Sequence, residues 1–95
     1  MLRIEWSARK NRGNILKHGV DFEEAKSVFD DPMQLTESDP DHSMDERRYI
    51  TIGMSDRNRL LIMAHTIEDD RIRIITARRP TRSERKDYEE GGFDA

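Results

Sequence analysis

The chain has 95 residues, 34% of them hydrophobic and 39% charged, with a formal net charge of −3; this length supports one modest core, so we expect a single domain over residues 1–95. The absence of cysteine excludes disulfides, thiolate catalysis and every cysteine-ligated zinc or iron–sulfur site. No apolar run approaches the roughly 20 residues that span a bilayer and the N-terminus lacks the apolar segment of a signal peptide, so we expect a cytoplasmic protein with no membrane partner.

The chain is predicted to begin with a strand and a helix. Apolar and charged residues alternate over residues 2–6, which is typical of a half-buried strand. Residues 8–18 are predicted to form a helix with Ile15 and Leu16 on its inner side. Gly19 follows in the position where a left-handed residue commonly ends a helix.

A second helix and a short strand come next. Asp21 is the expected N-cap, and Glu24 lies three residues later, at the spacing of a capping box. Apolar residues then repeat at helical spacing as far as Phe29, and residues 30–32 end the helix with a proline. A short strand over Met33–Glu37 is expected to follow.

The second half of the chain predicts a meander of three strands, Arg48–Met54, Arg59–Ile67 and Arg71–Arg79, joined by short polar turns. A last helix is capped by Thr81, with Glu84 completing a capping box, and ends at Gly91-Gly92. We therefore predict an α+β fold. The N-terminal strand and the meander would form a small antiparallel sheet, with two N-terminal helices and one C-terminal helix packed on it.

Basic residues concentrate near the end of the chain, where residues 71–86 hold seven Lys or Arg and one Glu. In the last helix, Arg82 and Arg85 are neighbours on one stripe, as are Arg85 and Tyr88. Guanidinium groups bind phosphate through a planar fork, and a tyrosine can stack on a base. The segment therefore predicts an anion-binding face, and simple alternation along the last strand places Ile72, Ile74, Thr76 and Arg78 together on one side.

The other polar signals are weaker. His18 ends a predicted helix, His42 lies in a predicted acidic loop over residues 38–46, and His65 interrupts an apolar strand, where a satisfied core histidine competes with a catalytic one. The spacing of Asp39, Asp41, Ser43 and Asp45 resembles a calcium loop, but Met44 and Ile50 occupy its glycine and glutamate positions, so we predict no metal site. Glycine-rich phosphate loops and serine-hydrolase elbows are also absent from the sequence.

Several blocks together resemble the BrnT family over nearly the whole chain. They are Lys17-His18-Gly19-Val20-x-Phe22-x-x-Ala25-x-x-Val28-Phe29-x-Asp31-Pro32, Asp39-x-x-His42-Ser43-x-x-x-Glu46-x-Arg48, Ala64-His65-Thr66, Arg71-Ile72-Arg73-Ile74-Ile75-Thr76-Ala77-Arg78-Arg79 and Glu84-Arg85-x-x-Tyr88.

This resemblance implies a toxin of a type II toxin–antitoxin pair with a RelE-like ribonuclease fold, which cleaves RNA without a metal or other cofactor and thereby inhibits translation and growth. It also implies a BrnA-like ribbon-helix-helix antitoxin as partner, in a heterotetramer of two toxins and two antitoxins that represses its own operator DNA. Two alternatives remain: a toxin that attacks a protein target such as a topoisomerase, and a non-catalytic partner that modulates the DNA binding of its antitoxin.

Metal-free RNA cleavage requires a base, charge stabilisation and an acid around the phosphate. Arg78 or Arg79 is the expected phosphate ligand, with Arg85 as a second anion contact; His65 or Glu84 is the candidate base. Lys17, His18 and Tyr88 are candidates for the acid or for RNA contacts. The full predicted set is His65, Arg78, Arg79, Glu84, Arg85 and Tyr88 for catalysis, and Lys17, His18, Arg73, Arg82 and Lys86 for RNA binding.

Overall fold

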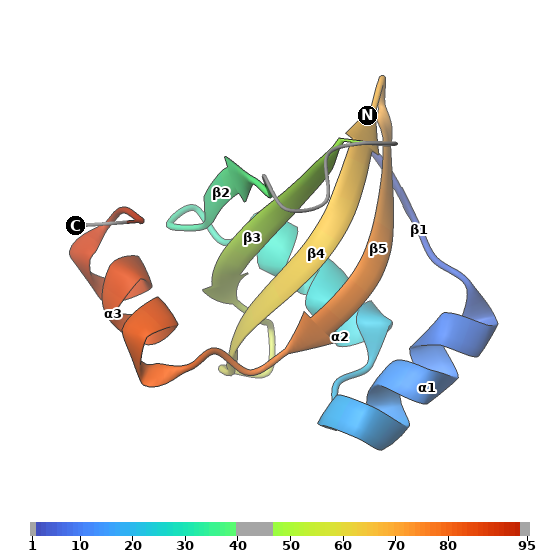
Figure 1. Ribbon diagram of the computed structural model, residues 1–95, viewed down its shortest axis with the longest axis horizontal. Helices are drawn as coiled ribbons and strands as arrows, with labels where there is room; N and C mark the ends of the chain where they lie inside the picture. The colour runs from blue at the N-terminus through green and yellow to red at the C-terminus, as the bar shows by residue number, and fades with distance from the viewer. Residues whose placement is uncertain (1, 40–46, 94–95) are drawn as a thin grey trace.

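The computed structural model describes residues 2–39 and 47–93, which form a sheet with helices on both faces (Figure 1). The predicted acidic loop, including His42 and most of the calcium-like spacing, falls largely outside the described residues. The elements are β1 (Arg3–Glu5), α1 (Ala8–His18), α2 (Phe22–Lys26), the 3-10 helix η1 (Ser27–Asp30), β2 (Leu35–Ser38), β3 (Arg48–Met54), β4 (Leu60–Glu68), β5 (Arg71–Arg78) and α3 (Arg82–Glu90). In the described part of the chain, no helix has the length and apolar character needed to cross a membrane.

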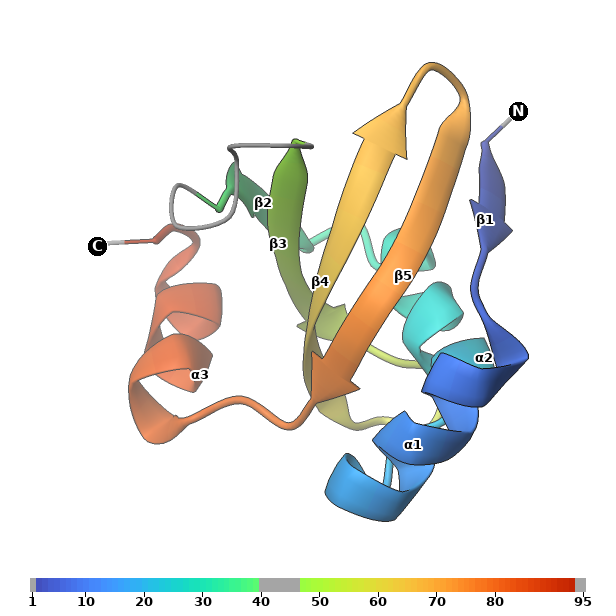
Figure 2. The same cartoon turned by 45° about the vertical axis from the view of Figure 1, so that its right-hand side comes forward.

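The sheet is mixed and has the strand order β1-β5-β4-β3-β2. The meander is antiparallel as predicted, but β1 runs parallel to β5, pairing Arg3 with Arg71 and Glu5 with Arg73. The prediction of a wholly antiparallel sheet is therefore wrong. Because α1 follows β1 directly and packs near the C-terminal end of β5 (Figure 2), β1 has to run in the same direction as β5.

Each face of the sheet carries its own apolar cluster. On one face α1, α2 and η1 lie over a core made of Val20, Phe22, Ala25, Val28, Leu61, Met63, Ile74 and Ala77. On the other face, Tyr88 of α3 and the following Phe93 pack against a smaller cluster of Ile52, Leu60 and Ile62. The α-helices therefore lie on both faces of the sheet, over different strands.

The inner side of α1 is polar, which corrects the prediction for this helix. Leu16 is 89% exposed and Ile15 is 40% exposed, whereas Asn14 is buried. The Asn14 amide donates to the carbonyls of Ala77 (2.8 Å) and Val20 (2.9 Å), and its oxygen accepts from the Ala77 N–H (3.1 Å). β1 pairs only with the start of β5, so the backbone of Ala77 needs another partner, and a side-chain amide supplies both a donor and an acceptor.

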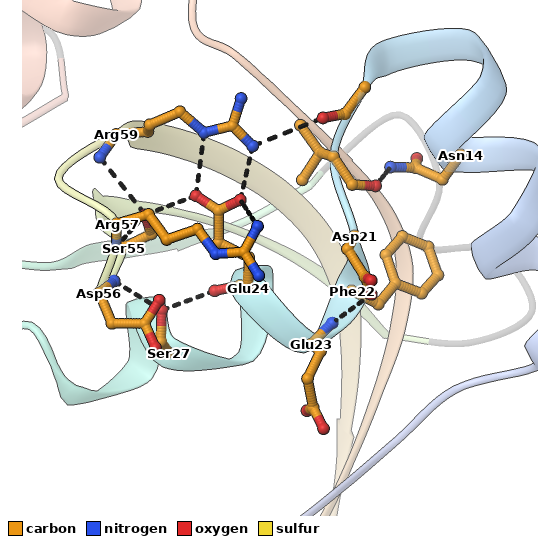
Figure 3. Close-up of polar contacts among 12 residues, drawn as sticks. Asn14, Asp21, Phe22, Glu23, Glu24, Ser27, Ser55, Asp56, Arg57 and Arg59 are labelled. Atoms are coloured by element: carbon orange, nitrogen blue, oxygen red, sulfur yellow. Dashed lines mark hydrogen bonds and ion pairs between the residues drawn. The ribbon is translucent and has the colours of Figure 1, made fainter.

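The start of α2 also differs from the prediction. Asp21 caps the helix by accepting from the Glu23 N–H (2.9 Å), but Glu24 does not close a capping box. Its carboxylate is buried and binds Arg59 and Ser55 of the β3–β4 turn instead (Figure 3). The predicted capping box of α3 is confirmed, since Thr81 and Glu84 exchange both bonds.

A register shift in the β4–β5 pairing overturns the predicted face assignment of β5. Ala64 pairs with Thr76, but the next residue, His65, pairs with Ile74, so Ile75 is an extra residue in β5. A bulge of this kind reverses the alternation of the residues beyond it. Ala77 consequently joins Ile74 in the core under the helices, and Arg78 comes to the same face as Arg73.

Candidate functional site

The candidate site is the half of the α3 face that α3 leaves uncovered. α3 packs chiefly on β3, and Figures 1 and 2 show β4 and β5 extending beyond it without a described helix over them on that side. We call this surface the open face. It contains a small pocket of about 70 Å³ whose lining residues are Ile50, Ile62, Met63, Ala64, Thr76 and Arg78.

Arg78 and Glu84 meet at the edge of this pocket. The Arg78 guanidinium donates from its two terminal nitrogens to the two Glu84 oxygens, at 2.8 and 2.9 Å, and also to the carbonyl of Arg79 at 3.2 Å. Glu84 in turn accepts from the Thr81 N–H at 2.8 Å. The ion pair raises the pKa of Arg78 and lowers the pKa of Glu84, and for both residues the hydrogen bond between them is the main cause.

These contacts leave one edge of Arg78 available. A guanidinium has five N–H donors in a rigid plane. Glu84 and the Arg79 carbonyl take three of them in the described structure, so the Nε–H and one terminal N–H remain. Those two donors form the side edge of the fork, which matches two oxygens of a phosphate. The Arg78 side chain is 40% exposed and lines the pocket.

Tyr88 lies one helical turn after Glu84 and binds Asp31. Its hydroxyl donates to Asp31 Oδ2 at 2.6 Å. Burial and this hydrogen bond raise the pKa of Tyr88 to about 12, so the phenol is protonated at neutral pH. Asp31 was predicted as part of a helix stop and lies in the first block that resembles the BrnT family, but neither signal indicated a contact with Tyr88.

The remaining predicted cations of this region are exposed. Arg79, Arg82, Arg85 and Lys86 all extend to the surface around the start of α3, and Lys86 lies 3.9 Å from Glu90. The side chains of the three arginines have no partner within the described ranges. In the described part of the chain, no contact joins their side chains to the Arg78–Glu84 pair.

His65 lies on the opposite face of the sheet from Arg78. It has no exposed surface, its Nε2 lies 2.7 Å from the Thr51 hydroxyl, and its ring packs edge-on against Phe29. Nδ1 is 3.3 Å from the Thr66 carbonyl, which assigns the proton to Nδ1. Burial lowers the pKa of His65, despite the opposing effect of the Thr66 bond, so the imidazole is neutral.

This buried neutral histidine predicts a pH-dependent stability. The unfolded chain takes up a proton at this position below about pH 6.5, whereas the folded chain resists it, so the free energy of unfolding should fall as the pH drops from 6.5 to 5. Urea denaturation across that range measures the effect. His65→Gln should flatten the slope; equal slopes in wild type and His65→Gln would contradict the assignment.

Lys17 and His18 are likewise not brought to the pocket. They form the last turn of α1, next to Gly19, whose carbonyl accepts from Arg59 at 3.4 Å. This places them by the β3–β4 turn, on the side of the sheet covered by α1. Arg73, by contrast, shares the open face with Arg78.

The same turn contains the most deeply buried charge pair of the described structure, which sequence reasoning missed (Figure 3). The Glu24 side chain has no exposed surface; Arg59 binds it through Nε at 3.0 Å and a terminal nitrogen at 2.5 Å, and Ser55 donates to it at 2.7 Å. The hydrogen bond from Arg59 lowers the pKa of Glu24 against the effect of burial. Because all its oxygens are occupied, this cluster is a structural link between α2 and the turn.

Comparison with known proteins identifies similar chains. Residues 6–84 match the model of a family described as the ribonuclease toxin, BrnT, of type II toxin–antitoxin systems. The fold is similar to the crystal structure of the Brucella abortus ribonuclease toxin BrnT, with a TM-score of 0.62 and 20% sequence identity over 86% of this chain and 100% of that chain. No curated protein sequence matches the chain.

Proposed function

Because the chain belongs to the BrnT family of ribonuclease toxins from type II toxin–antitoxin systems, we propose that it cleaves RNA on the open face, with Arg78 as the ligand of the scissile phosphate. One observation carries this assignment. Arg78 is fixed by Glu84 at the edge of a pocket while the side edge of its fork stays available. A preorganised donor pair of this kind stabilises the charge that develops on a phosphate during transfer.

We propose a metal-independent reaction in which the 2′-OH of the substrate attacks the adjacent phosphorus. The O2′–P bond forms and the P–O5′ bond breaks; the 2′ proton passes to water and the 5′ oxygen takes a proton from water, giving a 2′,3′-cyclic phosphate and a 5′-OH. The donor set of the open face supports this route. Glu84 is the carboxylate beside Arg78, and both of its oxygens are bound to that arginine, whereas Mg²⁺ requires free oxygen ligands.

The roles of the other predicted residues follow from their surroundings. Glu84 has a lowered pKa and no free oxygen edge, so we assign it to positioning Arg78 rather than to proton abstraction. His65 has no exposed surface, and we assign it to the core. Alignment of the 2′-OH and charge stabilisation by Arg78 are then the main contributions of the protein, and such alignment alone can supply several kcal/mol of barrier reduction.

We propose that the exposed cations Arg79, Arg82, Arg85 and Lys86, together with Arg73, guide the RNA backbone toward Arg78. Lysine and arginine contacts to phosphates supply affinity without sequence specificity. The acidic residues of the chain are concentrated elsewhere, in residues 21–46, which allows a local basic surface on a protein of net charge −3.

The type II family implies a protein antitoxin. We propose that this partner is a BrnA-like ribbon-helix-helix protein that covers the open face in a complex of two toxins and two antitoxins, and that the complex represses its own operator in the cytoplasm. A neutralising partner has to block the phosphate site or deform it, and the open face is the side of the sheet left uncovered. We further propose a RelE-like assignment for the fold, supported by the meander flanked by helices.

The proposal is tested with purified, antitoxin-free protein and an RNA oligonucleotide in EDTA. We expect cleavage that survives chelation, yields a 2′,3′-cyclic phosphate and stops when the 2′-OH at the cleaved position is replaced by hydrogen. Adding the cognate antitoxin should abolish it. Intact RNA together with accumulation of relaxed DNA in cells would instead indicate a topoisomerase target, and growth unaffected by expression would indicate a partner that only modulates DNA binding.

A further inference from the structure

Two polar contacts on one stripe hold α3 to the sheet. No residue of α3 is buried, and the helix is attached through the Arg78–Glu84 pair and, one turn later, through the bond from Tyr88 to Asp31. Tyr88 also packs on the small apolar cluster of its face. The orientation of Glu84 toward the pocket therefore depends on how firmly Tyr88 is anchored.

Asp31 is a rigid anchor because its carboxylate is saturated. Oδ1 accepts from the Met33 N–H at 2.8 Å, and Oδ2 accepts from the Met54 N–H at 2.7 Å as well as from Tyr88. The pairing of β2 with β3 reaches only as far as Ile52. The N–H of Met54 therefore has no strand partner in β2 and donates to the Asp31 carboxylate instead. The carboxylate thus ties together η1, the end of β3 and α3.

Gly53 provides the space for this arrangement. A Cβ at this position would lie 2.8 Å from Val28 Cγ1, which is closer than packed atoms allow, and 3.2 Å from Asp31 Oδ2, which is a tight contact. The backbone of β3 can therefore approach η1 and the Asp31 carboxylate at the same time. Apart from the bond from Tyr88, the Asp31 carboxylate is held by the two backbone hydrogen bonds from Met33 and Met54.

The bond between Asp31 and Tyr88 joins a carboxylate to a phenol throughout the physiological pH range. Burial opposes ionisation of Asp31, but hydrogen bonds from Met54, Tyr88 and Met33 outweigh it and lower the pKa of the carboxyl group. Tyr88 stays protonated. Hydrogen bonds to a charged acceptor are about twice as strong as neutral ones, so this contact is a permanent anchor and not a pH switch.

We propose that Asp31 is a positioning residue for RNA cleavage: through Tyr88 it fixes α3 on the sheet, and α3 then presents Glu84 to Arg78. The inference rests on the proposed function of the open face and adds a residue that touches neither RNA nor Arg78. Tyr88 acts in this scheme as a link to Glu84. A role as the proton donor of the reaction would require its hydroxyl to leave Asp31.

Tyr88→Phe is the primary variant, because it removes one hydroxyl and leaves the bonds of Asp31 to Met33 and Met54. We expect kcat for RNA cleavage to fall roughly tenfold to 10²-fold, since small misplacements of a catalytic group have effects of this size. Amide hydrogen exchange in α3 should rise while exchange in β4 stays unchanged. Tyr49→Phe is the matched control, since its ring stacks on His65 on the other face, and it should retain wild-type cleavage.

A double-mutant cycle separates positioning from a direct role. If Tyr88 acts through Glu84, adding Tyr88→Phe to Glu84→Gln should change kcat by less than about a factor of two, because the two losses share one cause. Equal losses in both backgrounds would overturn the inference and indicate a separate chemical role for the hydroxyl. Wild-type kcat in Tyr88→Phe would also overturn it, because the hydroxyl would then have no role in cleavage. After either result, Arg78→Ala would still show impaired RNA cleavage, and the proposed function would stand. If the wild-type protein leaves RNA intact, the inference and the proposed function are both overturned.

Discussion

Arg78→Ala should lower kcat/KM for RNA cleavage by roughly 10² to 10³-fold, the usual effect of removing one fixed donor from a site of developing charge. The substitution removes both the proposed phosphate donors and the partner that anchors Glu84. Arg78→Lys should recover little of the loss. A lysine retains the positive charge but lacks the planar fork, so it cannot bind Glu84 with two parallel bonds and offer two further donors to phosphate.

Controls on other arginines make this result specific. Arg12→Ala removes an exposed cation of α1, on the side of the sheet away from the open face, and should leave both stability and cleavage unchanged. Arg79→Ala removes an exposed cation next to the site and should weaken RNA binding with a smaller effect on kcat. A greater loss of kcat in Arg79→Ala than in Arg78→Ala would contradict the assignment, and steady-state kinetics with far-UV circular dichroism of each variant provides the comparison.

The elements of the fold could be predicted from the sequence because their signals are local. The strand pattern of Arg48–Met54 and the caps at Thr81, Gly19 and Gly91 depend only on neighbouring residues, and the structure confirms them. Family membership was predictable for a similar reason, since short blocks spread along the chain carried it. Boundaries and caps are determined by residues a few positions apart, which is the range over which a single sequence is informative.

The faces could not be predicted in the same way. Alternation places Arg73 and Arg78, five positions apart, on opposite sides of a regular strand. The extra residue Ile75 places the two arginines on the same side instead, and no residue type in β5 predicts the bulge. Arg78 was predicted from the sequence, but its place on the same face as Arg73 follows only from the pairing of β5 with β4.

Long-range polar pairs were the other source of error. Asn14 is buried in place of Leu16 because the backbone of Ala77, 63 positions away, needs hydrogen-bond partners. Asp31 binds Tyr88, 57 positions later. Both residues have ordinary local explanations as helix surface and helix stop, so their function depends on which distant group the fold places beside them.

Glu24 gives the prediction with the largest effect on stability. Its buried carboxylate binds Arg59 and Ser55, and breaking a buried charge pair by removing one partner typically costs roughly 3–5 kcal/mol of unfolding free energy. We expect Glu24→Gln to lie near the lower value, about 3 kcal/mol. The Arg59 side chain is 31% exposed and can regain water once its partner is neutral.

Glu23→Gln is the matched control, because it makes the same chemical change at the adjacent position of α2, where the side chain is exposed (Figure 3). Surface changes of this kind usually remain within about 0.5 kcal/mol. The pKa of Glu24 is lowered by Arg59, so its contribution is complete above about pH 4.5 and is lost as the pH falls through the lowered value. Urea denaturation should therefore show a large difference in the free energy of unfolding between Glu24→Gln and wild type at pH 7, and this difference should narrow toward pH 3. Equal free energies of unfolding for Glu24→Gln and Glu23→Gln at pH 7 would show that the buried pair contributes nothing beyond a surface charge.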